Sequence, residues 1–502
     1  MKRWNLMCRY WFIAASRWEL WSFCSLCLTV AAIVLTGCKV NQEKEQAYYQ
    51  DVLRGKNARA PGLLEPNQPL SLVTALEMAN WHNEQLAIKG EEYLQALIDK
   101  DRAASNFLPQ IAYIPTYTQE KKVTFLGAPG AISDFVLPHT FDQPVRAEMN
   151  LNVPADVANS KRAESAAQQQ RSLLLDLKST ILLDVARVYY QVLLAEARVK
   201  VLENSVGVQR DRVADIRSRY KAGTVLKLDV VQAEAQLSRT RVSLIKARNE
   251  VSTGRATLAF LVNSLSVESP LSDTFRLPGR LPPNEQLLLK AWYYRDDYRA
   301  AAYRVETAAH ILQEAWSRNF PSISLDFTYF LSRQSFPSKV DWIGSLGLNL
   351  PLFSAGLIHD DVRTAWSMLR QAKLAETYLQ RQISEELTVA VENYNDMHKQ
   401  TEELQVQVKA AEEQMQRSVH AYENGMATNL DTLIARDQLL NARLSLTEAR
   451  FNDKIYFLNL MRILGRFDPE NLTSGFEELL GDVPADGVSA RNFAEMHNEI
   501  GE

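Results

Sequence analysis

The sequence predicts an α+β fold, mainly α, built from one unit that occurs twice and combines a pair of strands with a long helical hairpin. Three observations lead to this prediction. They are an internal repeat, long stretches almost free of helix-breaking residues, and short segments in which apolar and polar residues alternate. The repeat constrains the fold most strongly, because copies of one unit adopt the same structure.

The repeat is clearest where residues 220–248 align without a gap on residues 422–450, at a constant offset of 202. Twelve of these 29 positions are identical, far more than unrelated segments share. The identical residues of the first copy are Tyr220, Gly223, Leu228, Asp229, Ala233, Gln236, Leu237, Arg241, Ser243, Leu244, Ala247 and Arg248. We therefore expect two copies of one structural unit.

The start of the chain is typical of an exported protein. Basic residues precede an apolar run at 23–35, which is shorter than the ~20 residues of a spanning helix and is typical of a signal peptide. The run ends at Cys38 in the sequence Leu-Thr-Gly-Cys, which resembles the lipobox of bacterial lipoproteins. We expect a lipoprotein signal peptide at 1–37 and a lipid-anchored N-terminal tether at 38–70. A plain signal peptide or anchor that happens to contain a cysteine is the alternative.

Cysteine usage and charge limit the possible partners. All four cysteines lie at or before Cys38, so packing or assembly, and no internal disulfide, must hold the rest of an exported chain together. The net charge of −4 does not suggest nucleic-acid binding. In lipoproteins of this kind, an Asp after the cysteine favours the inner membrane, so Lys39 points to the outer one. We expect no cofactor and no metal, only covalent lipid on Cys38.

Four segments with period-2 alternation form two pairs, at about 111–120 and 145–153 and at about 322–331 and 342–352. Such alternation gives a strand one apolar and one polar face. One such strand would also suit a soluble sandwich. Strand lengths near the ~9–11 residues of a membrane crossing, and aromatic residues near the strand ends, favour transmembrane strands. Four strands cannot close a barrel alone, so other copies must complete it.

Long helical hairpins are expected at about 155–261 and 358–464, where good helix formers dominate. Gly223 and Gly425 lie where a glycine ending a helix takes a left-handed conformation. Thr428 followed by Asp431 is typical of a capping box for the returning helix.

These elements divide the chain. We expect repeat 1 at 71–265, a proline-rich linker at 266–284 and repeat 2 at 285–465. The remainder, 466–502, is an acidic tail that either packs against the helices or is disordered.

The duplicated pattern Tyr-x-x-Gly-x-x-x-x-Leu-Asp, with a helix on each side, resembles the TolC-like outer membrane factors of the outer membrane efflux protein family. Residues 106–109 and 319–321, each closing a helix before a strand, and the junction at 350–356 resemble the same family. The lipobox is similar to that of its lipoprotein branch. The resemblance implies a homotrimer with a twelve-stranded outer-membrane β-barrel continuous with a periplasmic α-helical barrel.

The resemblance also implies a function. The protein would be the exit duct of a tripartite efflux or type I secretion system, lipid-anchored in the outer membrane and extending into the periplasm. Transport through it would be passive, with substrates delivered by an inner-membrane transporter through a periplasmic adaptor (membrane fusion protein). The substrate and the class of transporter are not indicated by the sequence.

A periplasmic gate is implied at Asp431 and Tyr422, with Asp229 and Tyr220 as the counterparts in the first repeat. Some members carry a second Asp three positions after the first, where this chain has Ile434. Three copies of an Asp could form a ring that attracts cations, although the helix dipole alone also favours an Asp at these positions. The hairpin tips are expected to dock the adaptor through Gly223, Thr224, Leu228, Gly425, Met426 and Leu430.

Three other classes of protein are the alternatives to a channel. We predict no enzyme, because the seven histidines form no H-x-x-x-H pair, no cysteine follows Cys38, and no phosphate-binding glycine loop occurs. A periplasmic adaptor lipoprotein would normally have one hairpin between small β domains. A coiled-coil structural scaffold would explain the helices but not the strands.

Overall fold

The computed structural model describes residues 40–54, 69–119, 139–277, 281–335 and 339–469. The predicted signal peptide, Cys38 and nearly all of the predicted C-terminal tail therefore lie outside the described residues. The chain divides into two units, Met1–Asp51 and Val52–Glu502. Helix α3 (Gln42–Arg54) begins in the first unit, and the other elements of the described residues belong to the second. None of the helices in the described ranges has the length and apolarity to span a bilayer.

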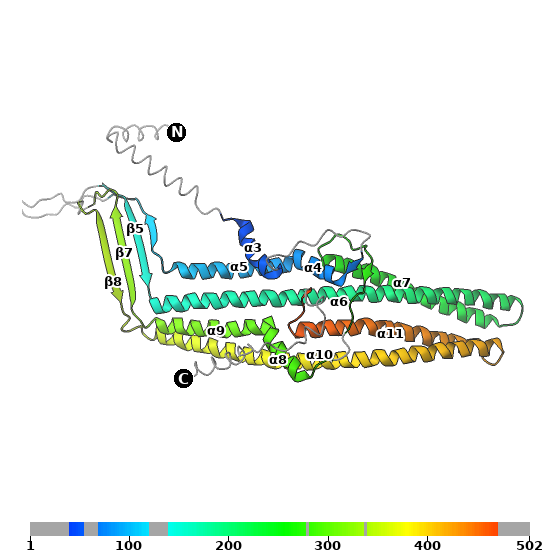
Figure 1. Ribbon diagram of the computed structural model, residues 1–502. Coiled ribbons are helices and arrows are strands. Elements are labelled where there is room, and N and C mark those ends of the chain that lie inside the picture. Colours follow the sequence, from blue (N-terminus) through cyan, green and yellow to red (C-terminus); the bar gives the residue numbers. More distant parts are fainter. Residues whose placement is uncertain (1–39, 55–68, 120–138, 278–280, 336–338, 470–502) are drawn as a thin grey trace, which may run out of the picture. The chain divides into compact units, whose positions relative to one another are not determined.

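The second unit contains the same series of four helices twice (Figure 1). The first copy has the helices α4 (Leu72–His82), α5 (Glu84–Ser105), α6 (Val153–Lys221) and α7 (Lys227–Leu261). The second has α8 (Asn284–Tyr294), α9 (Asp296–Ser317), α10 (Leu357–Glu423) and α11 (Asn429–Ile463). The bounds of α7 and α11 differ by 202 at both ends, so the repeat extends over the whole returning helix.

Four strands form one antiparallel sheet in the order β2-β5-β7-β8. Their bounds are β2 (Gln110–Tyr113), β5 (Pro144–Leu151), β7 (Ser322–Phe330) and β8 (Trp342–Asn349). Because β5 pairs with β7, the two repeats share a single sheet. The two-residue strands β1 (Leu70–Ser71) and β6 (Leu271–Ser272) pair in parallel elsewhere in this unit.

The prediction of one continuous strand at 111–120 is wrong. The chain leaves the sheet after Tyr113, and a separate strand β3 (Thr116–Gln119) pairs with β4 (His139–Asp142). Pro115 lies at the break, because proline has no N–H to give to a strand ladder. The strands predicted at 145–153 and 342–352 also end two or three residues early, at Leu151 and Asn349.

The register gives the four-stranded sheet one apolar and one polar face. Residues directly opposite one another point to the same side, so the alternating positions of all four strands combine. The apolar face carries Ile111, Tyr113, Val145, Ala147, Met149, Leu151, Ile323, Leu325, Phe327, Tyr329, Trp342, Gly344, Leu346 and Leu348. The described residues leave this face open, since Leu346 is 73% and Leu348 72% exposed.

The helices pack as two joined hairpins. Helix α6 packs on α7, α10 packs on α11, and α6 also packs on α11. At the end of the bundle nearer the sheet, α5 packs on α6, α6 packs on α9, and α9 packs on α10. The largest cluster of buried residues includes Leu76, Tyr189, Leu258 and Phe457, from α4, α6, α7 and α11. The Tyr189 hydroxyl donates to the Leu70 carbonyl at 2.7 Å, which ties strand β1 to the middle of α6.

Candidate functional site: the hairpin tips

Both hairpins turn through the same backbone motif. Gly223 has φ 78° and Gly425 has φ 73°, the left-handed conformation that the sequence predicts. The amide of Gly223 donates to the Tyr220 carbonyl at 3.0 Å, and the amide of Thr224 to the Arg219 carbonyl at 3.0 Å. This pair of hydrogen bonds is a Schellman motif, which satisfies the last carbonyls of a helix. Equivalent bonds from Gly425 and Met426 close the second turn.

The two predicted gate aspartates differ in their surroundings. Asp431 belongs to a complete capping box, accepting from the Thr428 hydroxyl at 2.7 Å and from its amide at 2.8 Å. These hydrogen bonds from Thr428 hold the pKa of Asp431 below its usual value. Asp229 accepts from the Leu226 amide at 3.0 Å, but Leu226 has no polar side chain to complete a box. Asp229 is therefore freer to engage another group.

That group is Asn429, at the start of α11 in the other hairpin. Asn429 is only 4% exposed. Its amide nitrogen Nδ2 donates to Asp229 Oδ1 at 3.4 Å, and its oxygen Oδ1 accepts from Arg212 Nη2 at 3.2 Å. A chain of hydrogen bonds thus links α6, α11 and α7. We call Arg212, Asn429 and Asp229 the tip bridge.

Tyr422 lies beside the tip bridge and is also engaged by the first hairpin. The guanidinium carbon of Arg212 lies 4.5 Å from the centre of its ring, and that of Arg219 lies 5.6 Å away. Asp215 forms ion pairs with both arginines, at 3.4 Å and 3.1 Å. The counterpart Tyr220 is 45% exposed. The structure therefore places Tyr422, Asp229 and Asn429 close to one set of α6 side chains.

Sequence reasoning missed Arg212, Asp215 and Asn429. The only available signal was that Asn429 replaces Lys227 of the first repeat, which marks the position as different without naming its partner. The contact itself joins residues 217 positions apart, which no local pattern reveals.

The ends of both hairpins also carry exposed apolar side chains. Leu228 is 60%, Met426 76% and Leu430 51% exposed. Of the predicted docking residues, Gly223 and Thr224 are exposed as well. These side chains are not needed to hold the turns, which are closed by backbone hydrogen bonds, and so they form a surface that a partner could cover.

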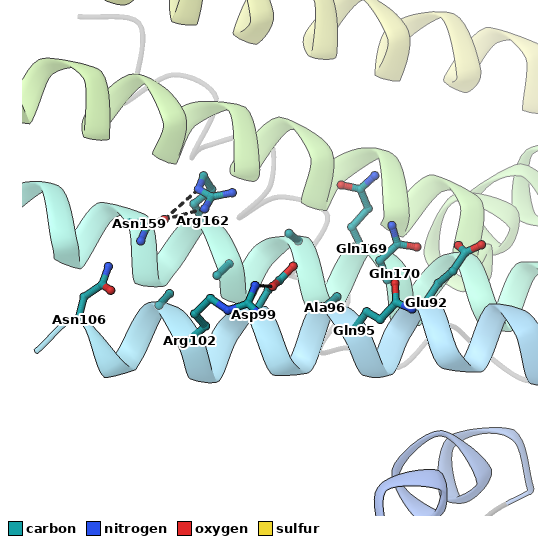
Figure 2. A pocket seen from close by; sticks show the side chains of 13 residues that line it. Glu92, Gln95, Ala96, Asp99, Arg102, Asn106, Asn159, Arg162, Gln169 and Gln170 are labelled. Atoms are coloured by element: carbon teal, nitrogen blue, oxygen red, sulfur yellow. Dashed lines mark hydrogen bonds and ion pairs between the residues drawn. The ribbon is translucent and has the colours of Figure 1, made fainter. Parts of the chain in front are cut away.

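One open cavity of about 590 Å³ lies between α5 and α6 (Figure 2). Its walls carry asparagine and glutamine together with charged groups that are already paired. Arg102 donates to Asp99 at 2.7 Å and Arg162 to the Asn159 oxygen at 2.6 Å. No histidine, serine or cysteine is among the side chains that line it. In the described part of the chain, no group of three or more His, Cys, Asp or Glu is placed to hold a metal ion.

Comparison with known proteins defines the class. The family "Outer membrane efflux protein" matches residues 99–264 and 290–466, which is more than half of the chain and includes both hairpins. The chain therefore belongs to the outer membrane efflux protein family, a family of channels, and is an outer membrane channel of the efflux and secretion type.

Individual relatives agree with this assignment. The chain is 23% identical to outer membrane efflux protein BepC of Brucella suis, over 62% of this chain and 69% of the relative. It is 21% identical to outer membrane protein TolC of Vibrio cholerae, over 62% and 73% of the two chains. The crystal structure of VceC from Vibrio cholerae superposes with a TM-score of 0.70 at 20% identity, covering 78% of this chain and 96% of that one. The last likeness establishes the fold.

Proposed function

We propose that three copies of this chain assemble into the exit duct of a tripartite efflux or type I secretion system. The observation that carries the proposal is the exposed apolar face of the four-stranded sheet. Strands β2 and β8 are its edges, and an open edge is not tolerated in lipid. Pairing of β8 in one copy with β2 in the next would close a barrel of twelve strands, with lipid covering the apolar face.

The helices offer a second contact between copies. Helices α5 and α10 stand at the two ends of the helix order α5, α6, α9 and α10. In a ring of three copies, α10 of one copy would therefore lie against α5 of the next. Both carry exposed apolar side chains, among them Ile88 on α5 (63%) and Leu374 and Tyr378 on α10 (71% and 63%). Apolar stripes of this kind are what helices bury against each other.

The remaining parts serve attachment and delivery. A covalent lipid on Cys38 would anchor each copy to the outer membrane. The exposed tip residues Leu228, Met426 and Leu430 suit docking of a periplasmic adaptor, which would couple the duct to an inner-membrane transporter. The duct itself needs no cofactor, since transport through it is passive.

The tip bridge and Tyr422 would hold the duct closed. They connect the first hairpin to the second through hydrogen bonds and cation–π contacts, so the hairpins cannot separate while these contacts last. Opening is then a shift between two states that a bound partner biases. Asp229 and Asp431, repeated three times around the axis, would place negative charge at the entrance and attract cations.

The test is single-channel recording of the full-length protein, extracted from outer membranes with detergent, in planar bilayers. The wild type is expected to conduct weakly. Arg212→Ala should raise its conductance several-fold, because it removes both the bond to Asn429 and the contact with Tyr422. Arg217→Ala is the matched control. Arg217 lies on the same helix but pairs with Glu234 inside the first hairpin, at 2.6 Å, so conductance should not change.

Two results would contradict the proposal. Absence of channels in every preparation would contradict the proposal that the protein is a duct. Equal conductance of the wild type and the Arg212 variant would be compatible with a duct but would contradict the role of the tip bridge as its gate.

A further inference from the structure

The four strands of the main sheet contain three charged residues, Arg146 and Glu148 on β5 and Asp326 on β7. All three lie on the polar face, opposite the apolar residues that alternate with them. Glu148 stands directly opposite Asp326 in the register, and Asp326 directly opposite Ser345. The charges therefore gather in one place near the middle of β7. We call these three residues the strand charge cluster.

Within the cluster one arginine serves two carboxylates. Arg146 donates to Asp326 Oδ2 from Nε at 2.8 Å and from Nη2 at 2.6 Å. Its Nε also lies 2.5 Å from Glu148 Oε1. The side chains of Arg146, Glu148 and Asp326 are 46%, 53% and 29% exposed. The cluster is thus open to solvent and carries one uncompensated negative charge per copy.

We infer that the strand charge cluster makes the interior of the barrel favour cations over anions. This inference rests on the proposed function, because it needs the apolar face to meet lipid and the polar face to line the lumen. Charges at mid-membrane depth are tolerated where they face water, and luminal charges tune which ions pass. Three copies would place three uncompensated negative charges at one level of the lumen, distant from the hairpin tips.

A purely structural role is the competing explanation, in which Arg146 only fastens β5 to β7. The two roles differ in what each substitution does. Arg146→Gln makes the cluster more negative and Glu148→Gln makes it less negative. If the cluster selects ions, the preference for cations should rise with the first substitution and fall with the second. Fastening predicts that either substitution loosens the sheet and leaves the preference for cations unchanged.

The test measures local charge inside the barrel without involving the gate. Ser345→Cys places one thiol beside Asp326 on the polar face, and the chain has no cysteine after residue 38 to compete with it. Intact cells are treated with cationic trimethylammonioethyl methanethiosulfonate or with anionic sulfonatoethyl methanethiosulfonate. The ratio of the two labelling rates is divided by their ratio on free cysteine. Protein without the added cysteine is the blank, and Leu346→Cys, on the apolar face, reports the orientation of the sheet.

The normalised ratio should exceed one with the native cluster. It should rise about fourfold with Arg146→Gln and fall about fourfold with Glu148→Gln, because a unit charge at ~10 Å in water changes each labelling rate about twofold, in opposite directions for the two reagents. The inference would be overturned if the normalised ratio were the same for the native cluster and both variants while Ser345→Cys is labelled and Leu346→Cys is protected. That result would not contradict the proposed duct. Labelling of Leu346→Cys with protection of Ser345→Cys would overturn the orientation of the sheet, and both proposals with it.

Discussion

At the scale of single residues, a buried arginine organises the junction between α8 and α9. The side chain of Arg295 is 4% exposed and is held by Asp297 at 2.6 Å and by Glu386 at 2.7 Å. A buried charge needs such partners to offset its loss of hydration. The neighbouring Asp296 has a weaker partner, Arg299 at 3.4 Å. Burial, reinforced by the negative charge of Asp176, raises the pKa of Asp296 to about 6.

This shift predicts how stability depends on pH. The pKa of Asp296 is higher in the folded protein than its ordinary value of 3.8, so the folded state binds the proton more tightly. Stability is therefore lost as pH rises from about 4 to about 6. Asp296→Asn should remove this loss and stabilise the protein by on the order of 2 kcal/mol at pH 7, with little effect at pH 4. Thermal unfolding of the purified protein at both pH values measures it.

Asp297→Asn is the control for this experiment. It leaves Arg295 with one carboxylate fewer, so it should lower the thermal midpoint at pH 7. A lower midpoint for Asp296→Asn as well would show that Asp296 is needed in its charged form.

At the scale of elements, the two hairpin turns are the same motif with the same requirement. Each needs a residue with positive φ directly after the C-cap of the helix, and glycine meets that need without steric cost. An added Cβ at Gly425 would meet no neighbouring atom within 4 Å, so the cost of a substitution there is conformational. Gly207 inside α6 has equally open surroundings but ordinary helical geometry.

The pair Gly425→Ala and Gly207→Ala separates these effects. Gly425→Ala should destabilise the protein by about 1 kcal/mol, because alanine avoids the left-handed region. Gly207→Ala should stabilise it by roughly 0.5–1 kcal/mol, because alanine is the better helix former. Chemical denaturation of both variants beside the wild type gives the two differences. Equal effects of the same sign would contradict a role for backbone conformation.

The turns were predictable from sequence because their causes are local. The turn glycines Gly223 and Gly425 and the Thr428–Asp431 capping box each depend on neighbours within a few residues. The apolar and polar faces of the strands are indicated by the period-2 alternation of the sequence. The break at Pro115 has a local cause too, because proline offers no N–H to a strand ladder. The tip bridge was not predictable, because Arg212 meets Asn429 only after both hairpins have folded and packed.

At the scale of the whole molecule, one sheet joins the two repeats and decides where the protein can reside. Eight directly opposed residue pairs connect β5 to β7, so neither repeat completes the sheet alone. The face that results is apolar across all four strands, and the other face holds every charge. Such a sheet is stable only if something apolar covers one side while water reaches the other. A bilayer around a water-filled barrel meets both conditions.

Two adjacent residues of β8 test this arrangement. Leu346 lies on the apolar face and Ser345 on the polar face beside Asp326. Leu346→Arg should destabilise the barrel by about 2–4 kcal/mol, the cost of an arginine facing lipid near mid-membrane. Ser345→Arg adds the same side chain one residue away but places it in water, next to a carboxylate, so assembly should continue. The yield of heat-resistant trimer in outer membranes measures both. Because size and charge of the new side chain are equal, only the face of the sheet distinguishes the variants, and equal yields would contradict a lipid-facing apolar surface.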